Sequence, residues 1–204
     1  MLTNQDIRSA HRVAVMASVD VVNSVTPKDL QRATPCDGWN LSHLLAHMTV
    51  QHHGFAAAAR GDGANPAHWD IATVADAVAT DPAGTYAAAA ADVLEAFADD
   101  DVLAASFALP EFGPGAAAPT SQAIGFHFVD YVVHGWDVAR AIDAPFTLPP
   151  DVISAVLPLV FAVPDGDFRA APSSPFAPAI AAGADVGDLD RALLHLGRSP
   201  VWTP

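Results

Sequence analysis

Apolar residues recur every three or four positions through the first half of the chain, and this spacing constrains the fold more than any other sequence feature. It places apolar side chains on one face of an α-helix, because a helix turns once in about 3.6 residues. The pattern is clearest in a first predicted helix, which follows Thr3 as the expected N-cap and ends at Thr26 before Pro27. Its apolar positions are Ile7, Ala10, Ala14, Ala17, Val21 and Val25.

Segments rich in proline and glycine divide the rest of the chain, and further helices are predicted between them. The segments 104–119 and 164–178 show little periodicity and are expected to be irregular, with a short extended piece near 176–181. Together these features predict an all-α four-helix bundle with additional short helices and a Pro-rich C-terminal loop region, in one domain over 1–204. The remaining predicted helices run from Leu41 towards Ala59, from Pro82 to Ala98, and over 121–142, 151–162 and 188–197.

The acidic net charge of the chain argues against some classes of binding partner. The chain has 23 acidic residues against 9 lysines and arginines, for a formal net charge of −14. Nucleic acids and anionic membrane surfaces both require clustered basic residues, so neither is an expected partner. Cys36 is the only cysteine, which excludes an intrachain disulfide, and the first residues lack the pattern of a signal peptide. We therefore expect a soluble cytoplasmic protein.

Several of the nine histidines have the spacing of metal ligands. Asp130 and His134 are four residues apart, so a helix places both on one face, and their donor atoms suit a divalent ion such as zinc. A third ligand must come from a facing helix. His47 fits because it lies at the edge of an apolar stripe, and His43, one turn earlier, is an alternative. His127 is expected to flank the site. The competing interpretation of the Asp130–His134 spacing is an ordinary helical side-chain pair.

Other polar residues have simpler predicted roles. Cys36 precedes a predicted helix, a position that lowers a thiol pKa, so it is a candidate nucleophile, although lone cysteines are more often packed. His52 and His53 are expected near a helix end, where a cationic histidine favours the dipole. Asp137 and Arg140 have the spacing of an ordinary ion pair. No partner is expected for His11, His68 or His195.

Three blocks of sequence carry a resemblance to a known family. They are residues 34–40 (TPCDGWN) with 44–47 (LLAH), residues 133–141 (VHGWDVARA), and the tail 194–202 (LHLGRSPVW). The first block resembles the opening motif of the DinB-like proteins. The blocks together resemble the metal-binding domain of mycothiol-dependent maleylpyruvate isomerases and a single-domain actinobacterial subgroup of their relatives.

The resemblance implies a four-helix bundle that holds a divalent metal, typically zinc, through His47, Asp130 and His134. The family usually has glutamate where this chain has Asp130, and the shorter side chain requires the ion to lie nearer the helix or to be bridged by water. The extra C-terminal domain of the isomerase is expected to have no counterpart here. That difference argues against maleylpyruvate isomerisation itself.

Three functions remain open on the sequence. Three protein ligands leave an open coordination position, where a bound thiol would lose its proton and attack a small electrophile as a thiol S-transferase or isomerase does. The resemblance implies that this thiol is mycothiol. The second function is a non-catalytic bundle that binds a metal or a small ligand, or that forms a homodimer. The third is a hydrolase that activates a metal-bound water.

Overall fold

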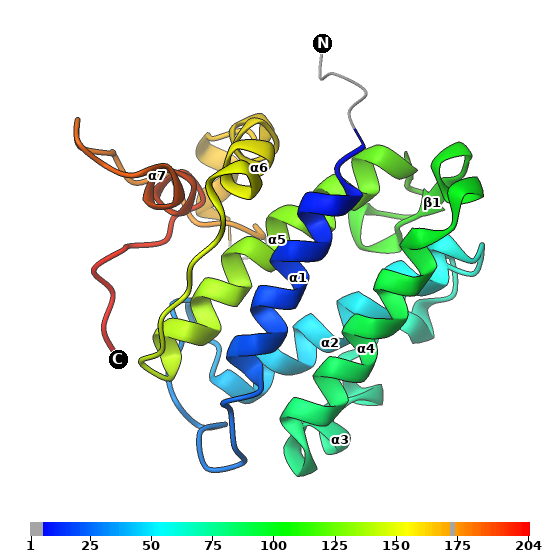
Figure 1. Ribbon diagram of the computed structural model, residues 1–204, viewed down its shortest axis with the longest axis horizontal. Helices are drawn as coiled ribbons and strands as arrows, with labels where there is room; N and C mark the ends of the chain where they lie inside the picture. The colour runs from blue at the N-terminus through cyan, green and yellow to red at the C-terminus, as the bar shows by residue number, and fades with distance from the viewer. Residues whose placement is uncertain (1–5, 172–173) are drawn as a thin grey trace.

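The computed structural model describes residues 6–171 and 174–204, and the described part is predominantly helical (Figure 1). Its four longest helices are α1 (Arg8–Val22), α2 (Leu41–Ala59), α4 (Pro82–Ala98) and α5 (Thr120–Ala141). Both α1 and α2 pack against α4 and α5, so the four helices enclose one core. The predicted all-α four-helix bundle is confirmed.

Shorter elements connect and cover the bundle. The strands β1 and β2 pair antiparallel with Phe107 opposite Ala118, in a segment that was expected to be irregular. Within the described ranges no strand forms over 176–181, where an extended piece was expected. No helix among the described residues combines the length and the apolarity that a bilayer crossing needs. The shorter elements that connect and cover the bundle are α3 (Ala75–Thr80), α6 (Pro150–Ala162), α7 (Asp188–His195), β1 (Ser106–Ala108), β2 (Ala117–Pro119), and the 3₁₀ helices η1 (Pro66–Trp69), η2 (Ile71–Thr73), η3 (Asp100–Ala104), η4 (Pro110–Phe112) and η5 (Asp167–Ala170).

Local sequence explains where the bundle helices begin. The side chain of Asn40 accepts a hydrogen bond from the His43 backbone N–H, which makes Asn40 the N-cap of α2. Asp81 caps α4 in the same way through the N–H of Gly84. Thr3 lies outside the described residues, and α1 begins after Ile7 without a side-chain cap. Capping side chains therefore define two of the four N-termini.

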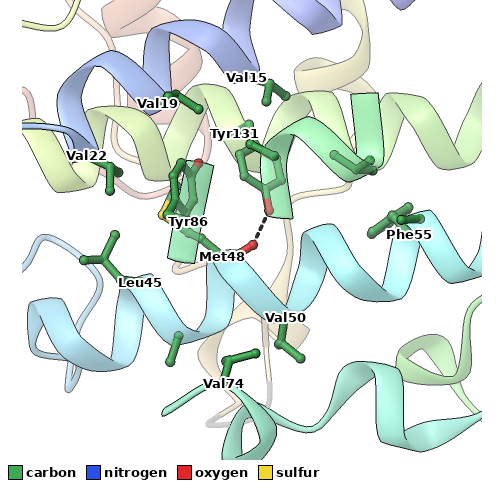
Figure 2. Packing of buried hydrophobic residues seen from close by; sticks show 14 of the residues in the cluster. Val15, Val19, Val22, Leu45, Met48, Val50, Phe55, Val74, Tyr86 and Tyr131 are labelled. Atoms are coloured by element: carbon green, nitrogen blue, oxygen red, sulfur yellow. Dashed lines mark hydrogen bonds between the residues drawn. The ribbon is translucent and has the colours of Figure 1, made fainter. Parts of the chain in front are cut away.

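A hydrogen bond through the core fixes α5 against α2. The buried Tyr131 on α5 donates its hydroxyl to the backbone carbonyl of Met48 on α2 (Figure 2). Tyr131 follows Asp130 directly, and Met48 follows His47 directly. The bond therefore sets the register of the two helices at the level of these candidate ligands. Apolar side chains surround it, among them Val15, Val19, Val22, Leu45 and Tyr86.

The chain after α7 returns to the C-terminal end of α5 (Figure 1). Arg140, in the last turn of α5, donates hydrogen bonds to the carbonyls of Pro200 at 2.9 Å and Trp202 at 3.3 Å. The expected pair between Asp137 and Arg140 is wrong, because Asp137 is fully buried and pairs with Arg198 instead. These bonds hold the C-terminal segment against α5.

Candidate metal centre

His47, Asp130 and His134 converge on one point between α2 and α5. One ligating atom from each lies within 4.8 Å of the other two. The Asp130 carboxylate lies between the imidazoles, with Oδ1 3.4 Å from Nε2 of His134 and Oδ2 3.8 Å from Nε2 of His47. The two imidazole rings are nearly perpendicular, at 81°. The structure thus brings together the three residues that the sequence predicted.

The geometry of these donors fits a small divalent ion. Bonds of about 2.0–2.2 Å in a tetrahedral site place neighbouring donor atoms about 3.4 Å apart. The observed gaps of 3.4 and 3.8 Å exceed a normal N–H···O distance, so the groups converge without hydrogen bonding to one another. Imidazole and carboxylate donors suit zinc and other first-row metals. The shorter side chain of Asp130 still reaches towards both histidines.

The site opens to solvent on one side. The side chains of His47 and Asp130 are 20% and 25% exposed, whereas that of His134 is 7% exposed. Burial lowers the pKa of His47 to about 4, although the charge of Asp130 works in the opposite direction. The imidazole of His47 is therefore neutral at pH 7, as a metal ligand must be.

Asp137 and Arg198 extend the site behind His134. Nδ1 of His134 lies 2.9 Å from Oδ2 of Asp137, and Nη2 of Arg198 lies 3.2 Å from the same oxygen. Neither contact is predicted from the sequence. The spacing of three residues between His134 and Asp137 could have indicated a shared helix face. Nothing in the sequence places Arg198 beside α5.

A second group of candidate ligands shares His134. Cys36, His134 and Asp137 also bring ligating atoms within 4.8 Å of one another. The cationic Arg198 contacts Asp137, which opposes a metal ion there, and the hydrogen bond to Asp137 already occupies Nδ1 of His134. Burial raises the pKa of the Cys36 thiol to about 11. These features favour a packed, protonated cysteine over a nucleophile or a ligand.

Aromatic and polar side chains border the centre at its two ends. Trp39 stacks on His43 with ring centroids 4.4 Å apart, and its ring lies 4.9 Å from that of His47. His43, the alternative ligand, is outside the converging group. On the same face of α2, one turn after His47, Gln51 donates a hydrogen bond of 2.6 Å to Glu111. Burial raises the pKa of Glu111, and the charge of Asp130 adds to this effect.

Three other histidines form a chain of contacts inside the core. Nε2 of His11 lies 2.8 Å from Nδ1 of His127, and Nε2 of His127 lies 3.2 Å from Nδ1 of His52. All three are buried, and the ring of Tyr131 stacks on both His52 and His127. Burial lowers the pKa of His11 to about 3, and it lowers the pKa values of His52 and His127 well below the usual range.

The core contacts correct several expectations about the histidines. His52 is not a cation at a helix end, because this part of α2 faces the core. His127 contacts His11 and His52 in the core and does not flank the metal centre. Two histidines that were expected to have no partner also have one outside the core: His68 with Asp62, at 2.7 Å, and His195 with the carbonyl of Val163, at 3.0 Å.

Comparison with known proteins places the chain in a family. The family model described as "Mycothiol maleylpyruvate isomerase N-terminal domain" matches residues 11–139. The chain belongs to this family. The matched segment contains the whole candidate centre, His47, Asp130 and His134, and it ends before α6.

Two similar relatives come from Mycobacterium tuberculosis. They are "Uncharacterized protein MT0763" of strain CDC 1551 / Oshkosh and "Uncharacterized protein Rv0738" of strain ATCC 25618 / H37Rv. Each is 26% identical to this chain over 191 residues, which cover 93% of this chain and 96% of the relative. The likeness to these two relatives therefore extends beyond the segment that the family model matches and includes α6.

Two solved structures share the fold. A crystal structure of the mycothiol-dependent maleylpyruvate isomerase aligns with a TM-score of 0.64 at 16% identity, over 95% of this chain and 89% of that chain. A structure of a histidine-to-alanine mutant of such an isomerase aligns with a TM-score of 0.56 at 15% identity; the alignment covers 75% of this chain and 65% of that chain. We expected the C-terminal domain of the isomerase to lack a counterpart, but the 89% coverage extends the fold likeness beyond the part that holds the candidate centre.

Proposed function

We propose that the protein binds one divalent metal ion, zinc, through His47, Asp130 and His134, and that this centre catalyses a thiol-dependent S-transfer or isomerisation of a small electrophile. The observation that carries the proposal is the convergence of three donor atoms within 4.8 Å at a solvent-accessible side of α2 and α5. Membership of the mycothiol maleylpyruvate isomerase family supports mycothiol as the thiol.

The charge of the donor set favours an anionic ligand from solvent. Two neutral imidazoles and one carboxylate offset only half of a divalent charge, so an anionic thiolate is electrostatically favoured at an open position. When bound, the ion would supply the positive charge that stabilises the thiolate of the thiol cosubstrate. The partly exposed edges of His47 and Asp130 leave a path for that thiol.

The surrounding residues hold the ligands and border the centre. Tyr131 fixes α5 against α2 through the Met48 carbonyl, one residue from each of two ligands. The ring of Trp39 packs beside that of His47, with centroids 4.9 Å apart. The protonated thiol of Cys36 does not compete with a cosubstrate as the nucleophile, because burial raises its pKa to about 11.

Metal stoichiometry tests the proposed centre. The protein is produced with zinc available, desalted, and analysed for metal per chain, as wild type and as His134→Ala. We expect about one ion per wild-type chain and a large loss in the variant. His68→Ala is the matched control, because His68 pairs with Asp62 outside the centre, and it should retain the ion. Unchanged stoichiometry in His134→Ala would exclude this metal site.

Turnover separates the proposed reaction from the two alternative functions. The zinc-loaded protein is assayed with a panel of small electrophiles, with and without mycothiol. We expect product only when the thiol is present. Product without thiol would indicate metal-dependent hydrolysis, and a fully loaded protein without turnover would indicate a binding module.

A further inference from the structure

We propose that Asp137 and Arg198 are positioning residues for the candidate metal centre, and that they fix the tautomer and the ring orientation of His134. This inference rests on the proposed function, because it assigns these two residues a role towards the ion that His134 would bind. Neither residue is among the three candidate ligands, and Arg198 lies outside the segment that defines the family, 11–139.

Asp137 is a hydrogen-bond partner of His134. Nδ1 of His134 lies 2.9 Å from Oδ2 of the fully buried Asp137. A carboxylate accepts hydrogen bonds and donates none, so Nδ1 must carry the hydrogen. The lone pair of a neutral His134 ring then lies on Nε2, the nitrogen that is 3.4 Å from Asp130. Asp137 therefore selects the tautomer that can bind a metal at this point.

Asp137 also contacts the C-terminal segment through Arg198. The Arg198 guanidinium is buried and reaches Asp137 with Nη2 at 3.2 Å and Nε at 3.4 Å. A buried carboxylate needs a compensating charge, and Arg198 supplies it. Nη1 also donates to the Leu196 carbonyl, which ties the guanidinium to its own segment. Residues beyond α7 are thus joined to His134 through one buried carboxylate.

The pair of Asp137 and Arg198 has a role beyond holding the fold together. A buried ion pair contributes little net stability compared with apolar residues of similar volume, because both ions must lose their hydration. The contact from Asp137 to His134, at 2.9 Å, is shorter than its contacts with Arg198. Partners that orient a metal-binding histidine in this way typically affect metal affinity when they are changed.

The experiment compares metal affinity with stability. The double variant Asp137→Leu/Arg198→Met replaces the pair by apolar side chains and removes the acceptor for Nδ1. We expect its zinc Kd, measured by competition with a chromophoric chelator, to rise about 10- to 100-fold. The melting temperature of the metal-free protein should fall modestly, because the buried Nδ1–H of His134 loses its acceptor, whereas loss of the ion pair itself costs little. In Asp137→Asn the amide oxygen still accepts a hydrogen bond, so the zinc Kd should lie between those of the wild type and the double variant.

A matched control removes an ion pair elsewhere. Arg60→Met/Asp92→Leu eliminates a 2.6 Å contact between the end of α2 and α4. This variant should keep the wild-type zinc Kd within about twofold, because it changes no partner of His134. An equal loss of affinity in the control and in the Asp137→Leu/Arg198→Met variant would overturn the inference.

A second readout needs neither metal nor a variant. Nitrogen-15 chemical shifts of the imidazole in the metal-free wild type report which nitrogen of His134 carries the hydrogen. We expect it on Nδ1, and a hydrogen on Nε2 would overturn the inference even if zinc binds. A hydrogen on Nδ1 in a protein that binds no zinc would support the tautomer assigned to His134 and would refute both the proposed function and the role of Asp137 and Arg198 towards a metal. An unchanged zinc Kd in Asp137→Leu/Arg198→Met, with zinc bound by the wild type, would refute the positioning role alone.

Discussion

The buried histidines of the core make the stability of this protein sensitive to mild acid. His11, His52 and His127 lie in the core with lowered pKa values, about 3 for His11. In the unfolded chain a histidine has a pKa of about 6.5. At pH values between the native and the unfolded pKa, the unfolded state binds more protons than the native state. The free energy of unfolding therefore falls as the pH falls. The perturbation is a change from pH 7 to pH 5.

The magnitude follows from proton linkage. A histidine that stays neutral in the native state and titrates with a pKa of about 6.5 when unfolded loses about 2 kcal/mol of stability between pH 7 and pH 5. Three such residues together lose about 6 kcal/mol, which is comparable with the whole stability of an ordinary domain, about 5–15 kcal/mol. His47 adds to this loss of stability at low pH, because burial lowers its pKa as well.

Urea unfolding at pH 7, 6 and 5, with a chelator present, measures this loss. We expect the free energy of unfolding to decrease steeply over the range. His127→Leu should reduce the dependence on pH, because it removes one of the three titrating groups. His43→Leu is the control, since His43 is exposed and stacks on Trp39, and it should leave the dependence unchanged. A wild-type change of less than about 1 kcal/mol would refute the reasoning.

Three further predictions concern the candidate centre and its support. Asp130→Glu should retain zinc, and Asp130→Asn should lose much of it, because only the glutamate keeps an anionic ligand; metal analysis of both variants checks this. Tyr131→Phe should cost about 1–2 kcal/mol in urea unfolding, because it removes the buried hydrogen bond to the Met48 carbonyl. Full stability would contradict the role assigned to that bond. Cys36→Ser should retain zinc and thiol-dependent turnover, and the wild-type thiol should react slowly with iodoacetamide at pH 7, since burial raises its pKa to about 11; rapid alkylation would contradict the assignment.

The convergence of the three candidate ligands could be predicted because its signals are local. Asp130 and His134 are one helical turn apart on α5, and His47 lies at the edge of an apolar stripe on α2. Helical spacing alone places each of these side chains on a face. The family resemblance then supplied the pairing of the two helices. The structure brings the three donors together.

The contacts that support the site could not be predicted in the same way. Arg198 reaches Asp137 from 61 residues away, and no periodicity links the two positions. The contacts among His11, His52 and His127 are not predicted from the sequence, which leaves His11 without a partner, places His52 near a helix end and His127 beside the metal site, because hydrophobic patterning counts histidine as polar. The pairing of β1 with β2 was missed because three-residue strands are too short for an alternating pattern to show.

Anomalous diffraction from crystals grown with zinc tests the central claim most directly. Data collected on both sides of the zinc absorption edge locate the ion and report its occupancy. We predict one strong peak within about 2.0–2.2 Å of Nε2 of His47, Nε2 of His134 and one carboxylate oxygen of Asp130. No peak at this point, or a peak beside Cys36 and Asp137, would contradict the account.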